Sequence, residues 1–384
     1  MKNAFIFSII ALISNTLLGC TSESANTVSD IATDEFNEIP GFLEEYNVPG
    51  VSIAIIRDYK IDQLLAYGYK NNETLAPVTT DTQFQAASIS KSVTAVAAMK
   101  MAQNGMIDLH EDINNVLVSW TAKENEYTKE EKINLRRLLS HTAGTSVHGF
   151  AGYSQNEAIP SLQEILNGQA PANSPAIVVN NTPGSQFSYS GGGYVIAQQA
   201  LIDVTQQPFE DLIREAVFEP LGMMSSSFNQ FLSEDRIASI SAGHDLNGQN
   251  IPGDYKLYPE MSAAGLWTTP EDLAKLLIEL QLSMLNQSNI ILAGEVAEEM
   301  ITPIEGSDLG SGDLFYGLGF MILKQGDELI FGHAGNQTGF HSEMGASKSG
   351  TGYVVMTNGD NGPDVIEEIV SLIENSDTEN TQPL

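Results

Sequence analysis

The sequence predicts an α+β fold (α/β sandwich-like) in which one antiparallel sheet is built from strands near both ends of the chain and is flanked by helices. Two β-rich runs lie at residues 51–60 and 63–71, and several more lie between 316 and 358. Residues from about 106 to 260 hold short helical patterns and long loops rich in Gly, Asn and Pro. Strands at both ends with helices between them indicate one sheet, an inserted mostly helical region, and a cleft where the two parts join.

The first elements follow from turn signals and hydrophobic periodicity. Residues 36–50 favour a short helix that a Pro-Gly pair ends. The runs 51–60 and 63–71 are rich in β-branched and aromatic residues, so they predict a hairpin. Residues 90–103 repeat Ala, Val and Met at intervals of three and four, which predicts a helix followed by a glycine stop.

The later elements begin with a clear helix start. Thr269 is typical of an N-cap, Pro270 suits the first helical position, and Asp272 would complete a capping box. Four strands and a last helix are then expected at 316–325, 327–335, 341–349, 352–358 and 363–375, before a polar tail at 376–384.

The N-terminal 20 residues predict a targeting segment. One Lys precedes a short apolar run, and the run ends in "LLGC", whose Cys20 is the only cysteine of the chain. This ending resembles a bacterial lipobox, which implies a lipid-anchored periplasmic or cell-surface protein, with Thr21 favouring the outer membrane. The alternative is an ordinary secretory signal in which Cys20 is incidental. Residues 21–35 are small, polar and acidic, as expected of a flexible tether.

The charge balance limits the partners. The chain has 49 acidic and 17 basic residues, a formal net charge of −32. Phosphate binding relies on clustered Lys and Arg, and the arginines form no run longer than Arg136-Arg137, so nucleic acid is not an expected partner. We interpret the excess of acidic residues as favouring solubility through charge repulsion. Adaptation to a salt-rich habitat is a more specific alternative.

Ser88 and Lys91 form the first candidate site, at the predicted start of the helix at 90–103. Residues at i and i+3 share one helix face, so the Lys amine can reach the Ser hydroxyl. A serine becomes a nucleophile when a base takes its proton, and a desolvated lysine can act as that base. Free N–H groups at the helix start suit a developing oxyanion. A single SxxK spacing is also expected by chance in a chain of this size, so the pair alone does not establish a catalytic site.

Two later segments contain further candidate residues for the same site. "PGSQFSYSGGGY" places Tyr189 in a Gly-rich turn before a helix, where a phenol can project into a cleft. "LIFGHAGNQTGF" places His333 on a strand that continues through the small residues Ala334 and Gly335, along which a substrate could lie. Taken singly, Tyr189 is best interpreted as a packed aromatic side chain, and His333 as a polar side chain whose hydrogen bonds are all made within the protein. No GxSxG, HExxH, Walker or GxGxxG motif occurs. The histidines have no other metal-ligating residues at a suitable spacing, so no cofactor or metal is expected.

With these segments, the chain from about 36 to 375 resembles the serine hydrolases of the class C β-lactamase, penicillin-binding carboxypeptidase and family VIII esterase superfamily. Five further stretches support the resemblance: residues 135–144, 183–194, 218–223, 262–276 and 332–340. The resemblance implies Ser88 as the acylated nucleophile, Lys91 as its proton partner and Tyr189 as a second base. It also implies an oxyanion hole from the backbone N–H groups of Ser88 and Asn336. His333 would stand where many relatives have the Lys of a KTG triplet.

Two departures from that pattern bear on the substrate. The third position of the family's YxN triplet, whose Asn contacts the substrate amide, is here Gly191, which weakens the case for β-lactam turnover. The second departure is His333 in place of the KTG lysine, so recognition of a substrate carboxylate would depend on His333 or on residues that sequence alone does not place.

Three other residues have two interpretations each. His141 and His148 could line the cleft; for His141 we favour capping of the preceding helix, with Gly144 permitting the turn, and for His148 neither interpretation is preferred. For Trp267 we favour packing near the cleft rim over a functional role.

The sequence thus predicts an exported serine hydrolase that cleaves a small ester or amide through a Ser88 acyl-enzyme. A D-Ala-D-Ala carboxypeptidase, a D-aminopeptidase or a weak β-lactamase is the alternative within this class. A non-catalytic cell-envelope binding protein is the alternative outside it, and Gly191 is its only support. The acyl group itself depends on how loops at 145–175 and 240–260 close over the cleft.

Overall fold

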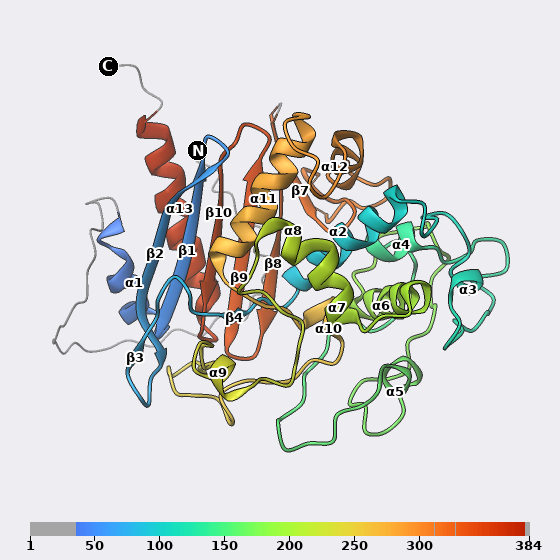
Figure 1. The fold of residues 1–384 in the computed structure, drawn as a ribbon, viewed down its shortest axis with the longest axis horizontal. Coiled ribbons are helices and arrows are strands. Elements are labelled where there is room, and N and C mark those ends of the chain that lie inside the picture. The colour runs from blue at the N-terminus through green and yellow to red at the C-terminus, as the bar shows by residue number, and fades with distance from the viewer. Residues whose placement is uncertain (1–35, 311, 327, 381–384) are drawn as a thin grey trace.

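The computed structural model describes residues 36–310, 312–326 and 328–380. They form an α+β fold around an eight-stranded antiparallel sheet of order β3-β2-β1-β10-β9-β8-β7-β6 (Figure 1). Strands from the two ends of the chain meet in the middle of the sheet, where Val51 of β1 pairs with Thr357 of β10. The predicted fold is confirmed.

The N-terminal half of the sheet is the predicted hairpin. β1 (Gly50–Arg57) and β2 (Lys60–Asn71) are joined by Asp58 and Tyr59, both with positive φ, as the tightest hairpin turns require. The short β3 (Ala76–Pro77) forms the outer edge.

The C-terminal half contains β6 (Leu314–Tyr316), β7 (Met321–Gln325), β8 (Glu328–Gln337), β9 (Phe340–Ser347) and β10 (Gly352–Thr357). The single strand predicted at 316–325 is therefore wrong, because two strands with a turn between them occupy this segment. Gly319 has a φ of 84°, and a Cβ at Gly317 would lie 2.1 Å from the Met300 carbonyl oxygen. Both glycines are needed for the turn.

Helices cover both faces of the sheet (Figure 1). α1 (Ile39–Glu45) and α13 (Gly362–Asn380) pack on one face, and α11 (Pro270–Met284) packs on the other. The central strand β1 is buried on both: Val51, Ile53 and Ile55 join the apolar cluster under α13, whereas Ala54 and Ile56 join the main core. This two-sided burial explains its nearly continuous apolar sequence.

The last helix is longer than predicted. α13 continues to Asn380, so the polar tail expected from residue 376 is helical in its first part. Arg57 Nε donates to Asp377 Oδ1 at 2.6 Å, and the Ser376 hydroxyl donates to the Ile373 carbonyl. These contacts extend the helix past the end of its apolar stripe.

The region between the two halves of the sheet is mostly helical. It contains α2 (Ile89–Gln103), α3 (Ile113–Val116), α4 (Leu135–Leu139), α5 (Leu162–Asn167), α6 (Gly191–Thr205), α7 (Phe209–Ile213), a π-helical turn (Arg214–Phe218), α8 (Glu219–Leu221), α9 (Glu234–Ile237), α10 (Met261–Ala264) and, after α11, α12 (Gly294–Met300). The insertion predicted at about 106–260 covers its helices α3 to α9. Two short strands, β4 (Phe84–Gln85) and β5 (Trp267–Thr268), pair with each other. Trp267 is fully buried between Tyr255 and Phe340, so it packs in the core rather than at a rim.

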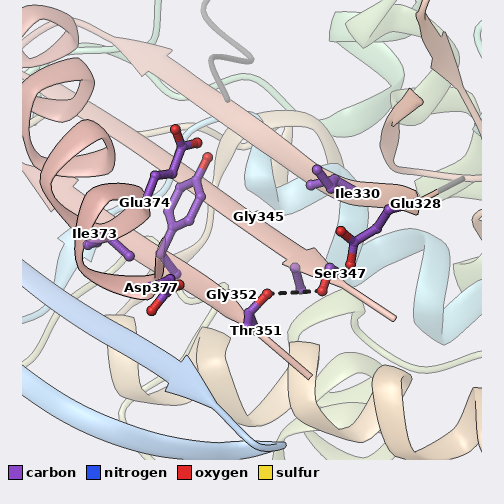
Figure 2. A pocket seen from close by; sticks show the side chains of 11 residues that line it. Glu328, Ile330, Gly345, Ser347, Thr351, Gly352, Ile373, Glu374 and Asp377 are labelled. Carbon is purple, nitrogen blue, oxygen red and sulfur yellow. Dashed lines mark hydrogen bonds between the residues drawn. The ribbon is translucent and has the colours of Figure 1, made fainter. Parts of the chain in front are cut away.

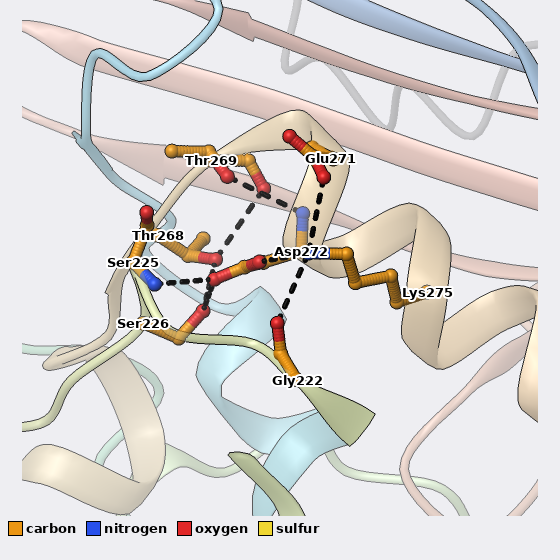
Figure 3. Close-up of polar contacts among 8 residues, drawn as sticks. All are labelled: Gly222, Ser225, Ser226, Thr268, Thr269, Glu271, Asp272 and Lys275. Atoms are coloured by element: carbon orange, nitrogen blue, oxygen red, sulfur yellow. Dashed lines mark hydrogen bonds and ion pairs between the residues drawn. The ribbon is translucent and has the colours of Figure 1, made fainter. Parts of the chain in front are cut away.

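The start of α11 corrects one detail of the sequence analysis. Thr269 caps the helix, accepting from the Asp272 backbone N–H, but the Asp272 carboxylate does not complete the capping box (Figure 3). It accepts instead from the Ser225 N–H and the Ser226 hydroxyl, both at 2.9 Å, and pairs with Lys275. The carboxylate therefore joins α11 to the loop after α8.

The predicted signal peptide at 1–20 with Cys20, and the tether at 21–35, lie outside the described residues. Export and lipid attachment at Cys20 stay predictions. Within the described residues, no helix combines the length and the apolar character needed to cross a bilayer.

Candidate active site

Ser88 and Lys91 lie together at the start of α2. Ser88 is the N-cap residue, yet its hydroxyl does not cap the helix. Lys91 Nζ lies 2.9 Å from Ser88 Oγ and donates to the Ala263 carbonyl oxygen at 2.7 Å. Lys91 is only 2% exposed, whereas Ser88 is half-buried and faces a cavity. The polar first turn is thus a pair of contacting groups and not a cap.

The residue before the nucleophile candidate has an unusual backbone. Ala87 has a φ of 47°, a left-handed conformation that is strained for alanine. Ser90 stabilises it, because its hydroxyl donates to the Ala87 carbonyl at 2.5 Å and accepts from the Leu266 N–H at 3.0 Å. This turn points the Ser88 side chain out of the helix and into the cavity.

Burial lowers the pKa of Lys91 to about 7. The desolvated ammonium is costly, so near neutral pH a large fraction of this side chain is an uncharged amine. An uncharged amine 2.9 Å from a hydroxyl can take its proton. Ser88 therefore has a base in hydrogen-bond contact.

A pH dependence follows from this shift. Below pH 7 Lys91 is protonated and loses its capacity as a base, so we expect kcat/KM to fall about tenfold per pH unit there and to level off above it. The measurement is kcat/KM for p-nitrophenyl butyrate from about pH 5 to about pH 9, with circular dichroism at each pH as the control for folding. A profile without an inflection near pH 7 would contradict the assignment of Lys91.

Tyr189 lies beside this pair, just before α6. Lys91 Nζ is 5.1 Å from the centre of its ring. Burial raises the pKa of the Tyr189 phenol, and a hydrogen bond with Ser88 lowers it in part. The phenol is therefore neutral at ordinary pH, and it can pass one proton on while it takes another.

His333 lies beneath the site rather than in its wall. Nδ1 is 2.6 Å from the Ala334 carbonyl oxygen, which can only accept, so Nδ1 is protonated and Nε2 accepts from the Tyr316 hydroxyl at 2.9 Å. Burial and the charge of Lys91 lower the pKa of His333 to about 3. The ring is neutral, fully buried and bonded at both nitrogens, so the structure does not place it where it could pair with a substrate carboxylate.

The cavity in front of Ser88 has a volume of about 750 Å³. Both loops expected from the sequence contribute to its wall, through His148, Gly149 and Phe150 and through Tyr258. Ala334 and Asn336 of β8 form one side. Sequence reasoning missed the segment 308–310, a Gly- and Asp-containing loop before β6, which also lines the cavity.

The glycines of the predicted site act through close packing and do not line the cavity. A Cβ at Gly335 would lie 2.2 Å from the Ala86 carbonyl oxygen, so its absence lets β8 approach the turn that presents Ser88. A Cβ at Gly191 would lie 3.0 Å from the Phe150 ring. Phe150 thus stands where a longer side chain at position 191 would extend.

The two histidines of the 141–148 loop flank Tyr189. The predicted capping of α4 by His141 is wrong for its side chain. Its Nδ1 accepts from the Ser190 N–H at 3.0 Å, and its ring centre is 4.1 Å from that of Tyr189. His148 lines the cavity with its ring centre 4.9 Å from that of Tyr189. Burial, and then the charge of Lys91, lower the pKa of His148.

A second cavity lies between α13 and the sheet and is lined by residues of β8, β9 and β10 (Figure 2). Its volume is about 70 Å³, room for very few water molecules, and it shares no residue with the large cavity. Among the side chains that the structure describes, no group of three or more His, Cys, Asp or Glu is arranged to hold a metal ion.

Comparisons with known proteins bear on this arrangement. The family model described as Beta-lactamase matches residues 36–373. Protein flp of Staphylococcus aureus (strain N315) is 26% identical over 59% of this chain, and penicillin-binding protein 4 of Amycolatopsis lactamdurans is 28% identical over 47%. The alignments span 43% and 45% of those two proteins, so the chain spans less than half the length of these curated relatives.

Two solved structures have the same fold. The octameric penicillin-binding protein homologue from Pyrococcus abyssi matches 89% of this chain and 77% of its own, with a TM-score of 0.72 and 24% identity. The D-amino acid amidase from Ochrobactrum anthropi SV3 matches 90% of this chain and 99% of its own, with a TM-score of 0.70 and 23% identity. Together with the family match over nearly the whole described region, these findings confirm the resemblance seen in the motifs: the chain belongs to the beta-lactamase family.

Proposed function

We propose that the protein is a serine acyl hydrolase that works through an ester of Ser88. The supporting observation is the contact between Lys91 Nζ and Ser88 Oγ at 2.9 Å, made by a buried amine whose pKa is lowered to about 7. In acylation, Ser88 Oγ bonds to the substrate carbonyl carbon while its proton moves to Lys91. Tyr189 passes its phenol proton to the leaving group as the bond between that group and the acyl carbon breaks, and Lys91 then gives the proton from Ser88 to Tyr189.

Hydrolysis of the acyl-enzyme completes the cycle. Water attacks the same carbonyl carbon and gives one proton to the Lys91–Tyr189 pair. The pair returns a proton to Ser88 Oγ as the bond between that oxygen and the acyl carbon breaks, so the acid product leaves and Ser88 is restored. The developing oxyanion would be bound by the backbone N–H groups of Ser88 and Asn336, two residues that line the cavity on facing elements. All of these steps use side chains and backbone groups of this chain.

The proposed substrate is a small ester or amide. The cavity of about 750 Å³ holds a molecule of that class, and apolar walls from Phe150, Leu309 and Met321 suit an apolar substituent. A D-amino acid amidase shares the fold, which adds amides of amino acids to the candidates. The Phe150 ring beside Gly191 gives no amide group to a β-lactam at the position where the family pattern has Asn.

The test is covalent labelling of the full-length folded chain with a fluorophosphonate, followed by intact-mass analysis and peptide mapping. We expect one adduct, located on Ser88, because a phosphonate captures a serine that a neighbouring base activates. The heat-denatured chain is the control and should stay unlabelled. An unlabelled folded protein would favour a non-catalytic binding protein instead, and an adduct on another serine would overturn the role of Ser88.

A further inference from the structure

The cavity wall holds few charged groups. Among the lining residues, Lys91 and Asp308 alone belong to the ordinarily charged types Asp, Glu, Lys and Arg. Lys91 Nζ is already in contact with Ser88 and with the Ala263 carbonyl oxygen. His148 is held toward its neutral form by burial, which lowers its pKa. The remaining fixed charge of the wall is the carboxylate of Asp308.

Asp308 is oriented by its own loop. Its Oδ1 accepts from the Gly310 N–H at 2.7 Å and from the Gly312 N–H at 3.4 Å. A carboxylate offers about four acceptor sites on two oxygens, so the second oxygen can bind a ligand in the cavity. The side chain is exposed, so a ligand can reach it from solvent.

These charges discriminate between classes of substrate. A substrate carboxylate would lose its hydration in the cavity and would meet no cation other than the base Lys91. It would also approach a chain whose formal net charge is −32, which repels anions and attracts cations. A protonated amine needs no cation in the wall, and the negative net charge of the chain attracts it. It can also form a charge-assisted hydrogen bond with Asp308.

We propose that the site selects acyl donors that have a protonated amine and no carboxylate, with Asp308 binding the ammonium group. Amides and esters of amino acids, and short peptides with a free N-terminus and a blocked C-terminus, are substrates of this class. The inference rests on the proposed acylation of Ser88 and specifies its substrate.

The test compares three p-nitroanilides of phenylalanine, each as both enantiomers: the free amine, the N-acetyl compound and the N-succinyl compound. At pH 7 an α-amino group is largely protonated, the acetyl compound is neutral and the succinyl compound is an anion. We expect kcat/KM to be about tenfold higher for the amine than for the acetyl compound and lowest for the succinyl compound. An acetyl or succinyl compound that reacts as fast as the amine would overturn the proposal.

Two charge-matched variants locate the effect. Asp308→Asn and Glu305→Gln each remove one negative charge from the same loop, but Glu305 is exposed and does not line the cavity. We expect Asp308→Asn to lower the amine-to-acetyl ratio of kcat/KM about tenfold and Glu305→Gln to leave it unchanged. Equal effects of both variants would mean that net charge, and not Asp308, sets the preference.

A binding measurement separates this proposal from the proposed function. Calorimetric titration of Ser88→Ala protein with phenylalaninamide and with N-acetylphenylalaninamide reports recognition without turnover. We expect the free amine to bind about tenfold more tightly, with the difference lost in the Ser88→Ala, Asp308→Asn double variant. Equal affinities would overturn the role of Asp308 even if Ser88 is acylated, and the expected preference would stand even if labelling of Ser88 failed.

A second inference concerns His141, which contacts the Tyr189 ring and the backbone of both of its chain neighbours. The backbone carbonyl of His141 accepts from the Ser188 N–H at 2.8 Å, and its Nδ1 accepts from the Ser190 N–H at 3.0 Å. The imidazole ring lies against the Tyr189 ring, with centres 4.1 Å apart. One residue thus fixes the backbone on both sides of Tyr189 and supports its ring.

The protonation state of His141 suits this arrangement. Because the Ser190 N–H donates to Nδ1, the ring proton is on Nε2. Burial, followed by the charge of Lys91, lowers the pKa of His141 well below its usual range, so Nδ1 keeps its lone pair. His141 does not line the cavity. We infer that His141 is a positioning residue that holds the Tyr189 phenol at Ser88.

The test compares His141→Ala with His141→Asn. The Asn side-chain oxygen can replace Nδ1 as the acceptor, and Asn tolerates the positive φ of 58° at this position. We expect kcat to fall about 100-fold in His141→Ala, to recover at least tenfold of that loss in His141→Asn, and KM to change little in both.

Both variants are then combined with Tyr189→Phe. If His141 acts through the Tyr189 hydroxyl, His141→Ala has little further effect on kcat in that background. The same loss of kcat with and without the Tyr189 hydroxyl, in proteins of equal melting temperature, would show that His141 acts elsewhere.

Discussion

Ser88→Ala is expected to abolish hydrolysis, with a loss of about 10⁴-fold or more in kcat for p-nitrophenyl butyrate. The variant keeps the cavity and the helix start but lacks the oxygen that bonds to the acyl carbon, so only binding and oxyanion stabilisation remain. The Ser88 hydroxyl does not cap α2, so the helix is not expected to be weakened. The measurement is steady-state release of p-nitrophenol by the full-length chain.

The matched control for this change is Ser185→Ala. Ser185 is an exposed serine whose hydroxyl donates to the Thr182 carbonyl of its own turn. It lies outside the cavity wall, and its removal should leave kcat within a factor of about two. Equal rates from the wild type and Ser88→Ala would remove Ser88 from the mechanism.

Lys91→Met is expected to lower kcat by about 10³-fold and to leave the melting temperature unchanged or higher. Methionine fills a similar volume but cannot accept the Ser88 proton. In the folded protein the pKa of Lys91 is about 7, below its ordinary value of 10.5, so the unfolded chain binds this proton more strongly. Lys91 therefore costs stability increasingly as the pH falls from 10.5 towards 7, and Met removes that cost.

Kinetics and thermal unfolding must be measured on the same preparation. Lys100→Met is the control, because Lys100 lies on the same helix and donates only to the Ala216 carbonyl, away from Ser88. It should keep its kcat. A Lys91→Met protein that turns over substrate like the wild type would show that another group takes the proton.

Local patterns in the sequence predicted most of the fold. β1 and β2 have alternating or continuous apolar residues and a tight connection, and α2 has Ala, Val and Met on several sides, which suits a helix that is buried on nearly every side. The extension of α13 escaped prediction because Asp377 is held by Arg57, a residue more than 300 positions earlier. Long-range contacts of this kind leave no local signal.

The candidate site divides in the same way. The i, i+3 spacing predicted the Ser88–Lys91 contact, since helix geometry alone brings these side chains together. The hydrogen bond to His333 Nε2 comes from Tyr316, which belongs to another strand, and the presence of Asp308 in the wall depends on how the loop before β6 folds back. Neither relation could be read from the residues themselves.

The pairing of β1 with β10 has a consequence for the newly made chain. Val51 can pair with Thr357 only after all the residues between them have been synthesised, and β8, which forms one wall of the cavity, belongs to the later part of that stretch. The loop closed by that contact is long, which slows folding. A growing polypeptide therefore contains Ser88 and Lys91 well before the site is assembled, and the chain becomes competent for acyl transfer only when β8 to β10 have joined β1.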